Sequence, residues 1–547
     1  MENVLYNLPQ VLADYVAVLA KRAGCGRKIQ QEVAEELRCH FIDALAGCEG
    51  DEARERCAEE LIKEFGDTKM LAKLIKRGKE RCRPLWQKVL YRTVYCLGGL
   101  ILFVVLYSVW FFTGRPTFSV NYLTKLNEMA RPASFDPDEN AWPYYEKAIS
   151  LYAGADEKLS ERISKTCGKE GYVSFTNLQE SEQAAISAWL SKNTEAWAEF
   201  ETGSRKPYCY REYNVGEKHD KDKPMLIAVL LPHLSELRDV ARLGVWRAEK
   251  QLADSKSVEA AQTCLTLVRV GRQWYEDRAT LIEQLVAQAI VNMAEETMLG
   301  VIAGGNLSAE QTKSVRADMA GIFGDDYPYM TAIEMEGMMF EDTVQHTFTK
   351  GGPGGGHIVP KMFAQLGGLT SEDEVAAVGL SVLHAGRDKT LEVGEKLYAH
   401  LTESAKMSPC DKRAGNFETT DEFLAPYNKW RYAFLRSLAP AIERVSTVRD
   451  QGKALHDATL TVLSLRQCQL EKGQLPETLD ELVQPGYSKA LPSDPFSKDP
   501  LKYKRTGDDF LLYSLGEDFD DDNGRENPND PWGRKDTGGD HVFWPVR

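Results

Sequence analysis

The chain of 547 residues lacks the short motifs that mark many enzymes. It contains no H-E-x-x-H zinc motif, no G-x-S-x-G nucleophile elbow and no G-x-x-x-x-G-K-[ST] phosphate loop. Its 11 cysteines include no C-x-x-C pair, which excludes a structural zinc site of the usual cysteine spacing. We therefore expect a protein that is not an enzyme, with no catalytic residue and no small-molecule substrate.

An excess of basic side chains is also missing over most of the chain. Residues 1–92 hold 17 Lys and Arg against 15 Asp and Glu, whereas residues 93–547 hold 50 against 67. Phosphate backbones are bound by clustered Lys and Arg, so this acidic balance argues against nucleic acid as a partner.

One stretch has no charged side chain at all. The 22 residues from Thr93 to Gly114 contain no Asp, Glu, Lys, Arg or His and are mostly aliphatic or aromatic. As a helix they would be about 33 Å long, enough to cross a hydrocarbon core of about 30 Å. Residues 93–114 are therefore predicted to form one transmembrane helix.

The charges beside this span predict its orientation. A basic cluster with only Glu80 against it precedes the span, namely Lys76, Arg77, Lys79, Arg81, Arg83, Lys88 and Arg92. By the positive-inside rule the N-terminus stays in the cytoplasm and the chain after about residue 115 is exported. The same basic cluster is suited to anionic membrane lipid at the inner surface.

The cysteines are divided between the two sides of the predicted span. Cys25, Cys39, Cys48, Cys57, Cys82 and Cys96 lie at or before the span, where a reducing compartment would keep them as thiols. Five widely spaced cysteines follow it, and among these Cys167 and Cys209 are a possible disulfide.

Residues 1–88 have the pattern of a small helical bundle. Apolar residues recur at four-residue steps in Ile29–Leu45, a second helix is predicted at Asp51–Phe65, and a third starts at Asp67 or Thr68. The segments Glu35-Glu36-Leu37 and Phe65-Gly66-Asp67, in this order, resemble the HAAS-type helical domain of bacterial membrane proteins over roughly residues 5–80. The resemblance implies a protein partner, such as a cytoplasmic regulator.

After a Pro-bearing connector at residues 115–140, residues 141–440 read as an exported, irregular array of amphipathic helices. The strongest helical pattern runs from Lys223 to Val301, and no 34-residue repeat is present. Within this body Glu334, Glu336 and Glu341, with Asp342 and His346, precede a glycine-rich loop at Gly351–Gly356. Carboxylates meeting in a groove would suit an envelope hydrolase, whereas outward-facing ones would suit a scaffold.

Residues 441–547 have the pattern of a small α+β module. A long helix is predicted at about Ile442–Leu470, a β-hairpin at Leu501–Arg505 and Phe510–Leu515, and a third strand at His541–Pro545. The order of Leu491-Pro-Ser-Asp-Pro495, Pro500-Leu-Lys-Tyr503 and Tyr513-Ser-Leu-Gly516, followed by an acidic end, resembles the globular part of type II secretion major pseudopilins.

This second resemblance implies a calcium site in the acidic loop. The residues that it points to are Asp518, Asp520, Asp521, Asp522 and Asp540. Ca²⁺ accepts six to eight oxygen ligands in flexible geometry, which carboxylate-rich loops supply. A solvated acidic turn is the alternative.

Together these features predict a mainly α protein of the bacterial inner membrane, with one span, a cytoplasmic helical bundle, an exported helical array and a C-terminal α+β module. We expect a scaffold or sensor that binds a cytoplasmic regulator or an envelope protein. The alternatives are an envelope hydrolase and a component of a type II secretion-like apparatus.

Overall fold

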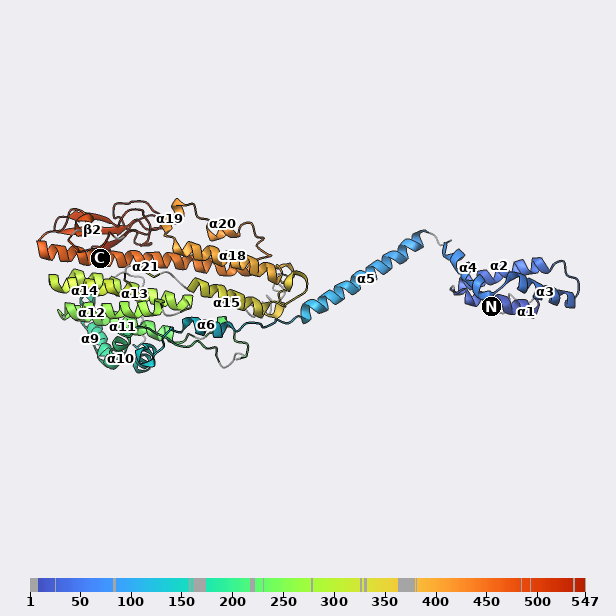
Figure 1. Ribbon diagram of the computed structural model, residues 1–547, viewed down its shortest axis with the longest axis horizontal. Helices are drawn as coiled ribbons and strands as arrows, with labels where there is room; N and C mark the ends of the chain where they lie inside the picture. Colours follow the sequence, from blue (N-terminus) through green and yellow to red (C-terminus); the bar gives the residue numbers. More distant parts are fainter. Residues whose placement is uncertain are drawn as a thin grey trace. The chain divides into compact units, whose positions relative to one another are not determined.

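The structure is a computed structural model (Figure 1). It describes residues 8–546 except 25, 82–84, 157–158, 161–173, 217–221, 230, 277–278, 325–326, 329–331, 363–378, 380, 484, 492 and 535–536. The chain forms two compact units, Met1–Trp110 and Phe111–Arg547. It is mainly helical, with one small antiparallel sheet in its described part, which confirms the predicted fold class at this level.

The first unit is a helical head followed by most of a long apolar helix. Its helices are α1 (Gln10–Arg22), α2 (Arg27–Leu45), α3 (Asp51–Phe65), α4 (Thr68–Arg81) and α5 (Leu85–Thr113). The predicted helices after Ile29, Asp51 and Thr68 are confirmed, because apolar residues at spacings of three and four give each helix one buried face. Leu12, Val16 and Leu19 of α1 meet Phe41 of α2 in the head's core.

The head also differs from the sequence expectation at two cysteines. Cys48, in the loop between α2 and α3, and Cys57, inside α3, form a disulfide, with their Cα atoms 7.1 Å apart. Thiols were expected at both positions because a reducing compartment keeps cysteines reduced. The sequence does not show that the loop brings these two side chains together. Cys209 is buried, and Cys167 lies outside the described residues, so their pairing stays a prediction.

The second unit is built from long helices that lie side by side in layers (Figure 1). The helices are α6 (Tyr122–Ala130), α7 (Trp142–Leu151), α9 (Glu180–Lys192), α10 (Thr194–Ser204), α11 (His233–Ala253), α12 (Ser257–Glu276), α13 (Leu281–Gly304), α14 (Ala309–Phe323), α15 (Ala332–Thr347), α18 (Arg387–Lys406), α19 (Pro409–Ala414), α20 (Thr420–Leu424) and α21 (Ala433–Lys472). Short 3₁₀ turns connect several of them, at Pro137–Glu139, Phe175–Asn177, Leu226–Ala228, Pro353–Gly355 and Leu479–Leu482.

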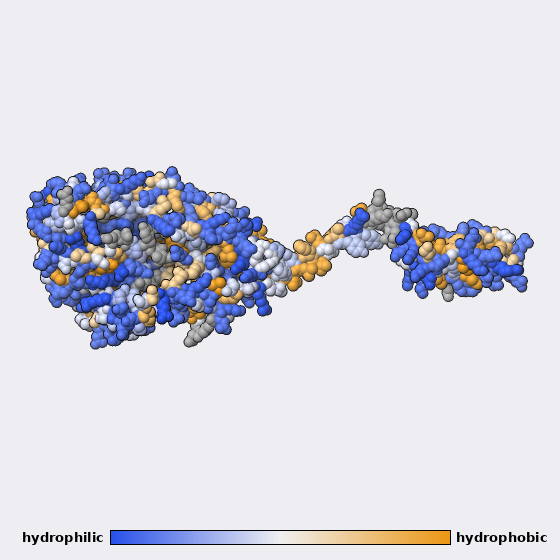
Figure 2. Space-filling view, viewed as in Figure 1, coloured by the Kyte–Doolittle hydropathy of each residue, from blue (hydrophilic) through white to orange (hydrophobic). Residues whose placement is uncertain are grey.

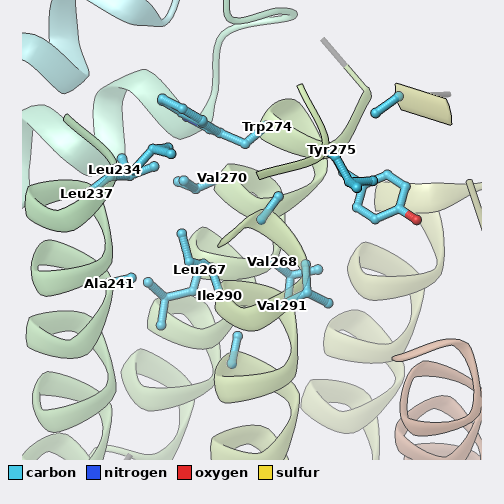
Figure 3. Close-up of a cluster of buried hydrophobic side chains, with 14 of the residues drawn as sticks. Leu234, Leu237, Ala241, Leu267, Val268, Val270, Trp274, Tyr275, Ile290 and Val291 are labelled. Atoms are coloured by element: carbon cyan, nitrogen blue, oxygen red, sulfur yellow. The ribbon is translucent and has the colours of Figure 1, made fainter. Parts of the chain in front are cut away.

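The core of this unit lies between α11, α12 and α13. Leu237, Leu267, Val268, Ile290 and Val291 are fully buried there, as the close-up of this cluster shows (Figure 3). The predicted helical pattern of Lys223–Val301 is confirmed and resolves into these three helices after a short 3₁₀ turn.

The predicted hairpin and third strand form the sheet. Strands β1 (Lys502–Thr506), β2 (Asp509–Ser514) and β3 (His541–Trp544) pair antiparallel in the order β1-β2-β3. Gly507 has a positive φ of 70°, which suits the two-residue turn that joins β1 to β2.

The long helix before the sheet begins earlier than expected, at Ala433 rather than at about Ile442. It is continuous through residue 440, where the sequence placed the border between the helical body and the C-terminal module. In Figure 1, α21 lies between the sheet on one side and α13 and α14 on the other. Leu299 of α13 belongs to the same apolar cluster as Leu512 and Trp544, so the body and the module share a core.

Candidate functional site

The acidic loop connects β2 to β3 and returns close to its own start. Phe519 and Asn523 have positive φ values of 64° and 61°, so the backbone turns sharply at both. At the far end of the loop the main-chain N–H of Gly539 donates to Asp518 Oδ2 at 3.1 Å and to Asp522 Oδ2 at 3.0 Å. The two carboxylates therefore meet at one backbone amide, although the predicted set was scattered over 23 residues of sequence.

Glycine is required at the point where these carboxylates meet. Gly538 and Gly539 have φ values of 64° and 112°, a region that residues with a Cβ rarely occupy. A Cβ on Gly539 would lie 2.8 Å from the main-chain nitrogen of Asn527, so the loop has no room for a side chain there.

Asp540 is the buried member of the cluster. Its side chain has no exposed surface, and its Oδ2 accepts a hydrogen bond from the Gly524 N–H at 2.6 Å. Its Oδ1 is buried without a hydrogen-bond partner. Burial raises the pKa of Asp540 to about 6 against the opposing effect of main-chain hydrogen bonds from Gly524 and Asp522, and the nearby Asp521 and Asp522 carboxylates add to the rise.

The two remaining predicted ligands lie on the outside of the loop. Asp520 and Asp521 are exposed. Asp521 Oδ1 accepts a hydrogen bond from the Tyr513 hydroxyl at 2.9 Å, and Asp520 Oδ1 accepts one from the Asp521 N–H at 3.1 Å. The structure thus brings Asp518, Asp522 and Asp540 to the inner side of the loop and leaves Asp520 and Asp521 toward solvent.

The described part of the chain contains no group of three or more His, Cys, Asp and Glu side chains arranged to hold a metal ion. A cation in this loop would therefore need the carboxylates to move toward one another. The unpartnered Oδ1 of Asp540 is the feature of the loop that a cation would satisfy, because a buried carboxylate oxygen without a partner is costly.

Two further aspartates support this loop, and sequence reasoning assigned a role to neither. Asp494 is buried and accepts hydrogen bonds from Ser514 Oγ at 2.8 Å and from the Leu515 N–H at 3.1 Å, which ties the Leu491–Pro495 segment to the end of β2. Asp530 accepts a hydrogen bond from the Thr537 hydroxyl at 2.6 Å. In the sequence, the pair Asp494-Pro495 and the run Asn527-Pro-Asn-Asp530 are typical of turns, and this pattern could have pointed to both aspartates.

The second candidate site, around α15, does not gather its carboxylates. Glu334 and Glu341 are exposed, and Glu341 Oε2 accepts a hydrogen bond from the Tyr122 hydroxyl at 2.8 Å. Glu336 is half-buried and accepts a hydrogen bond from the main chain of Leu281; burial raises its pKa to about 7. Glu336 and Glu341 thus bond to different parts of the unit, and Glu334 is exposed.

Asp342 and His346 of the same helix have structural partners. Asp342 is fully buried, and its Oδ2 accepts a hydrogen bond from the Leu226 N–H at 2.7 Å. His346 Nε2 lies 3.5 Å from Asp342 Oδ1. Asp342 therefore attaches α15 to the segment before α11, and this geometry gives the hydrolase hypothesis no support.

The largest exposed apolar surface of the described chain lies on α5. Side chains such as Leu100, Leu102 and Phe103 are 60%, 60% and 65% exposed. Figure 2 shows strongly hydrophobic surface along part of this helix. At its end, Phe111 stacks on His357, and His357 Nε2 donates to the Phe111 carbonyl oxygen at 2.9 Å.

A second helix, α13, is also long and apolar enough to cross a membrane. Its most apolar window is 67% buried, whereas that of the Val89–Thr113 segment is 6% buried. Ile290 and Val291 of α13 are enclosed by protein (Figure 3). Length and composition alone thus select two helices, and burial separates them.

Comparison of the chain with protein family models, with curated proteins and with solved structures finds no match.

Proposed function

We propose that this chain is a single-span membrane protein that acts as a scaffold or sensor, with its head in the cytoplasm and its second unit exported. The exposed apolar surface of α5 carries the proposal. Water-exposed apolar area costs roughly 25 cal/mol per Å², so a bare helix of this kind needs a lipid environment. Helix α13 needs none, because the protein itself covers it.

The orientation rests on the basic residues that precede the span. Lys76, Arg77 and Lys79 belong to the end of α4, and Arg92 lies near the start of the apolar part of α5. Each cation near an anionic leaflet contributes about 1 kcal/mol, which favours retention of this flank on the cytoplasmic side of a bacterial inner membrane.

A pair of matched variants tests the membrane proposal. Val104→Asp combined with Leu106→Asp places two charges in the middle of α5, at a cost of roughly 3 kcal/mol each for insertion. We expect carbonate washing to release this variant and to leave the wild-type protein in the membrane pellet. The control, Val291→Asp in α13, should lower the melting temperature of the exported unit without releasing the chain.

Orientation is tested separately, with intact spheroplasts. Added protease should digest residues after about 115 and protect a fragment of about 110 residues that contains the head. Retention of wild-type protein in the carbonate supernatant, or digestion of the head in intact spheroplasts, would contradict the proposal.

The scaffold role rests on the order of parts along the chain, a compact head before the apolar helix and a large helical unit after it. Affinity capture from detergent-solubilised membranes, followed by mass spectrometry, should recover a partner that is lost when the head or the exported unit is deleted. Recovery of pseudopilins would favour the secretion-apparatus alternative instead. If a fragment that contains only α5 recovered the same proteins in equal amounts, this result would contradict a scaffold role.

A second proposal is that the acidic loop holds Ca²⁺ through Asp518, Asp522 and Asp540, with Asp520 and Asp521 near the site. The unpartnered Oδ1 of the buried Asp540 supports it. A bound divalent cation would offset the repulsion among the carboxylates and stabilise the loop by mass action. Millimolar Ca²⁺ should therefore raise the melting temperature of the full-length protein.

Controls for calcium are available within the same loop. Asp522→Ala should abolish the Ca²⁺ shift, and so should the milder change Asp540→Asn. Asp508→Asn, in the turn between β1 and β2, removes an acidic residue outside the loop and should leave the shift intact. Full-length protein is required because Leu299 of α13 packs into the module's core. No shift in the wild type would end the calcium proposal.

A further inference from the structure

A polar groove lies in the exported unit, away from the acidic loop and from α15. It is formed by the C-terminal end of α10 with the residues that follow it, by one face of α12 and by α14, and its volume is about 740 Å³. Ligand pockets commonly have volumes of about 300–1,000 Å³. The groove is therefore large enough for a small molecule.

The groove is basic, in a chain whose formal net charge is −15. Four cationic side chains line it, namely Arg205, Lys206, Arg269 and Arg272. Two carboxylates, Glu201 and Asp318, lie among them. The groove thus has two more positive than negative side chains.

Arg269 differs from the other three cations of the groove in its contacts. It is half-buried on α12 and makes no hydrogen bond or ion pair within the described residues. Burial lowers its pKa, the nearby Arg205 adds to this effect, and Asp318 and Glu201 oppose it. A partly desolvated guanidinium without a hydrogen-bonded acceptor is suited to an anion from outside the chain.

The other three cations are held in place but keep unused donors. Arg205 pairs with Glu201 at 2.6 Å, and Arg272 pairs through NH2 with Glu276 at 2.6 Å. Lys206 Nζ donates to the carbonyl oxygen of Asp138 at 2.8 Å. Arg272 Nε is buried without an acceptor.

A buried glutamine fixes the two sides of the groove relative to each other. Gln273 of α12 donates through Nε2 to the carbonyl oxygens of Gly203, at 3.2 Å, and of Lys206. Its Oε1 accepts a hydrogen bond from Tyr145. The turn that carries Arg205 and Lys206 is therefore attached to the helix that carries Arg269 and Arg272.

We propose that this groove binds the phosphoryl group of a small molecule, with Arg269 as its main ligand and Arg205 and Arg272 beside it. A phosphomonoester carries a charge of about −1.5 to −2 at neutral pH, so it attracts the cations of this groove more strongly than a monovalent anion does. Guanidinium groups donate to phosphate oxygens in a bidentate manner, and three of them line this groove. A carboxylate has a single negative charge and two oxygens, so it accepts fewer hydrogen bonds from these cations than a phosphoryl group with three oxygens.

Titration of inorganic phosphate into the full-length protein in detergent tests this proposal. Isothermal titration calorimetry at constant ionic strength should show saturable binding to the wild type. A charge-assisted hydrogen bond contributes about 1.5–3 kcal/mol, so Arg269→Gln should weaken binding by about 10- to 100-fold. Arg272→Gln should weaken it less, and Arg269→Lys should retain part of the affinity.

The control is Arg238→Gln, an exposed arginine of α11 that does not line the groove, which should bind phosphate as the wild type does. Melting temperatures of all variants show whether a loss of binding reflects a loss of folding, and Arg272→Gln replaces Arg269→Gln if the latter does not fold. Titration of acetate at the same ionic strength tests whether a carboxylate binds as tightly as phosphate. The proposal is overturned if phosphate shows no saturable heat, if both groove variants bind like the wild type, or if acetate binds as tightly as phosphate.

Discussion

The imidazole of His456 and the carboxylate of Glu295 lie 2.6 Å apart in the buried interface between α21 and α13. His456 is 4% exposed and Glu295 is fully buried. Burial by itself would lower the pKa of His456, but the attraction and the hydrogen bond of Glu295 outweigh it, so that the pKa is raised. The pair connects the helix that leads to the sheet with the central helix of the body.

Removing one partner of this pair should cost more than removing both. His456→Leu leaves a buried carboxylate without its cation, and we expect it to lower the free energy of unfolding by about 3–5 kcal/mol. The double variant Glu295→Leu/His456→Leu leaves no unpaired charge and should recover much of that loss. Urea unfolding of the four proteins in the cycle measures the coupling. Additive effects would show that the two side chains act independently.

A pair of glycine variants tests the close approach of α12 to α13. A Cβ on Gly271 would lie 2.4 Å from Val291 Cγ2 and 3.0 Å from the Ala287 carbonyl oxygen, so Gly271→Ala should destabilise the unit by about 1–3 kcal/mol. On α14, a Cβ on Gly321 would meet nothing within 4 Å. Gly321→Ala should therefore stabilise the helix by about 0.5–1 kcal/mol. Thermal unfolding monitored by circular dichroism gives both values, and equal effects would contradict the packing described.

The pH dependence of stability should report on Asp540. Its pKa is about 6 in the folded protein, against 3.8 for an ordinary aspartate. Because the folded state binds the proton more tightly, this group favours folding at pH 4 and loses that contribution as the pH rises to about 6.

Asp540→Asn isolates that contribution from the other carboxylates. The variant keeps an acceptor for the Gly524 N–H but cannot ionise. Without calcium, we expect it to be more stable than the wild type at pH 7 and nearly equal at pH 4, as measured by urea unfolding at a series of pH values. An unchanged difference between the two proteins across this range would show that Asp540 does not titrate as described.

The redox state of Cys48 and Cys57 in cells tests whether the head lies in the cytoplasm. Cys48 and Cys57 form a disulfide in the structure, whereas a reducing cytoplasm favours thiols. In cells lysed directly into a maleimide-bearing polymer, we expect both thiols to be modified. After air oxidation of purified protein, neither should react until a reductant is added. The variant Cys48→Ser/Cys57→Ser is the control for the remaining cysteines, and protection of the pair in cells would contradict a cytoplasmic head.

The sequence alone was sufficient for features that depend on local patterns. A run of 22 residues without Asp, Glu, Lys, Arg or His identifies the apolar part of α5 whatever the rest of the chain does. Spacings of three and four residues predicted α2 and α3, and alternation around Gly507 predicted the hairpin of β1 and β2. The spacing of apolar residues sets which face of an element is buried, so these assignments need no knowledge of distant contacts.

Only the tertiary structure decided which distant groups meet. Asp518 and Asp522 share the Gly539 amide, Asp540 is buried beside them, and Glu334 and Glu341 are exposed. The helix α13 has the composition of a span but is covered by its neighbours, and the start of α21 at Ala433 joins two regions that sequence patterns separated. The physical reason is that a sequence pattern records which face of an element is apolar, whereas burial, pairing and cavity shape arise from side chains on other elements.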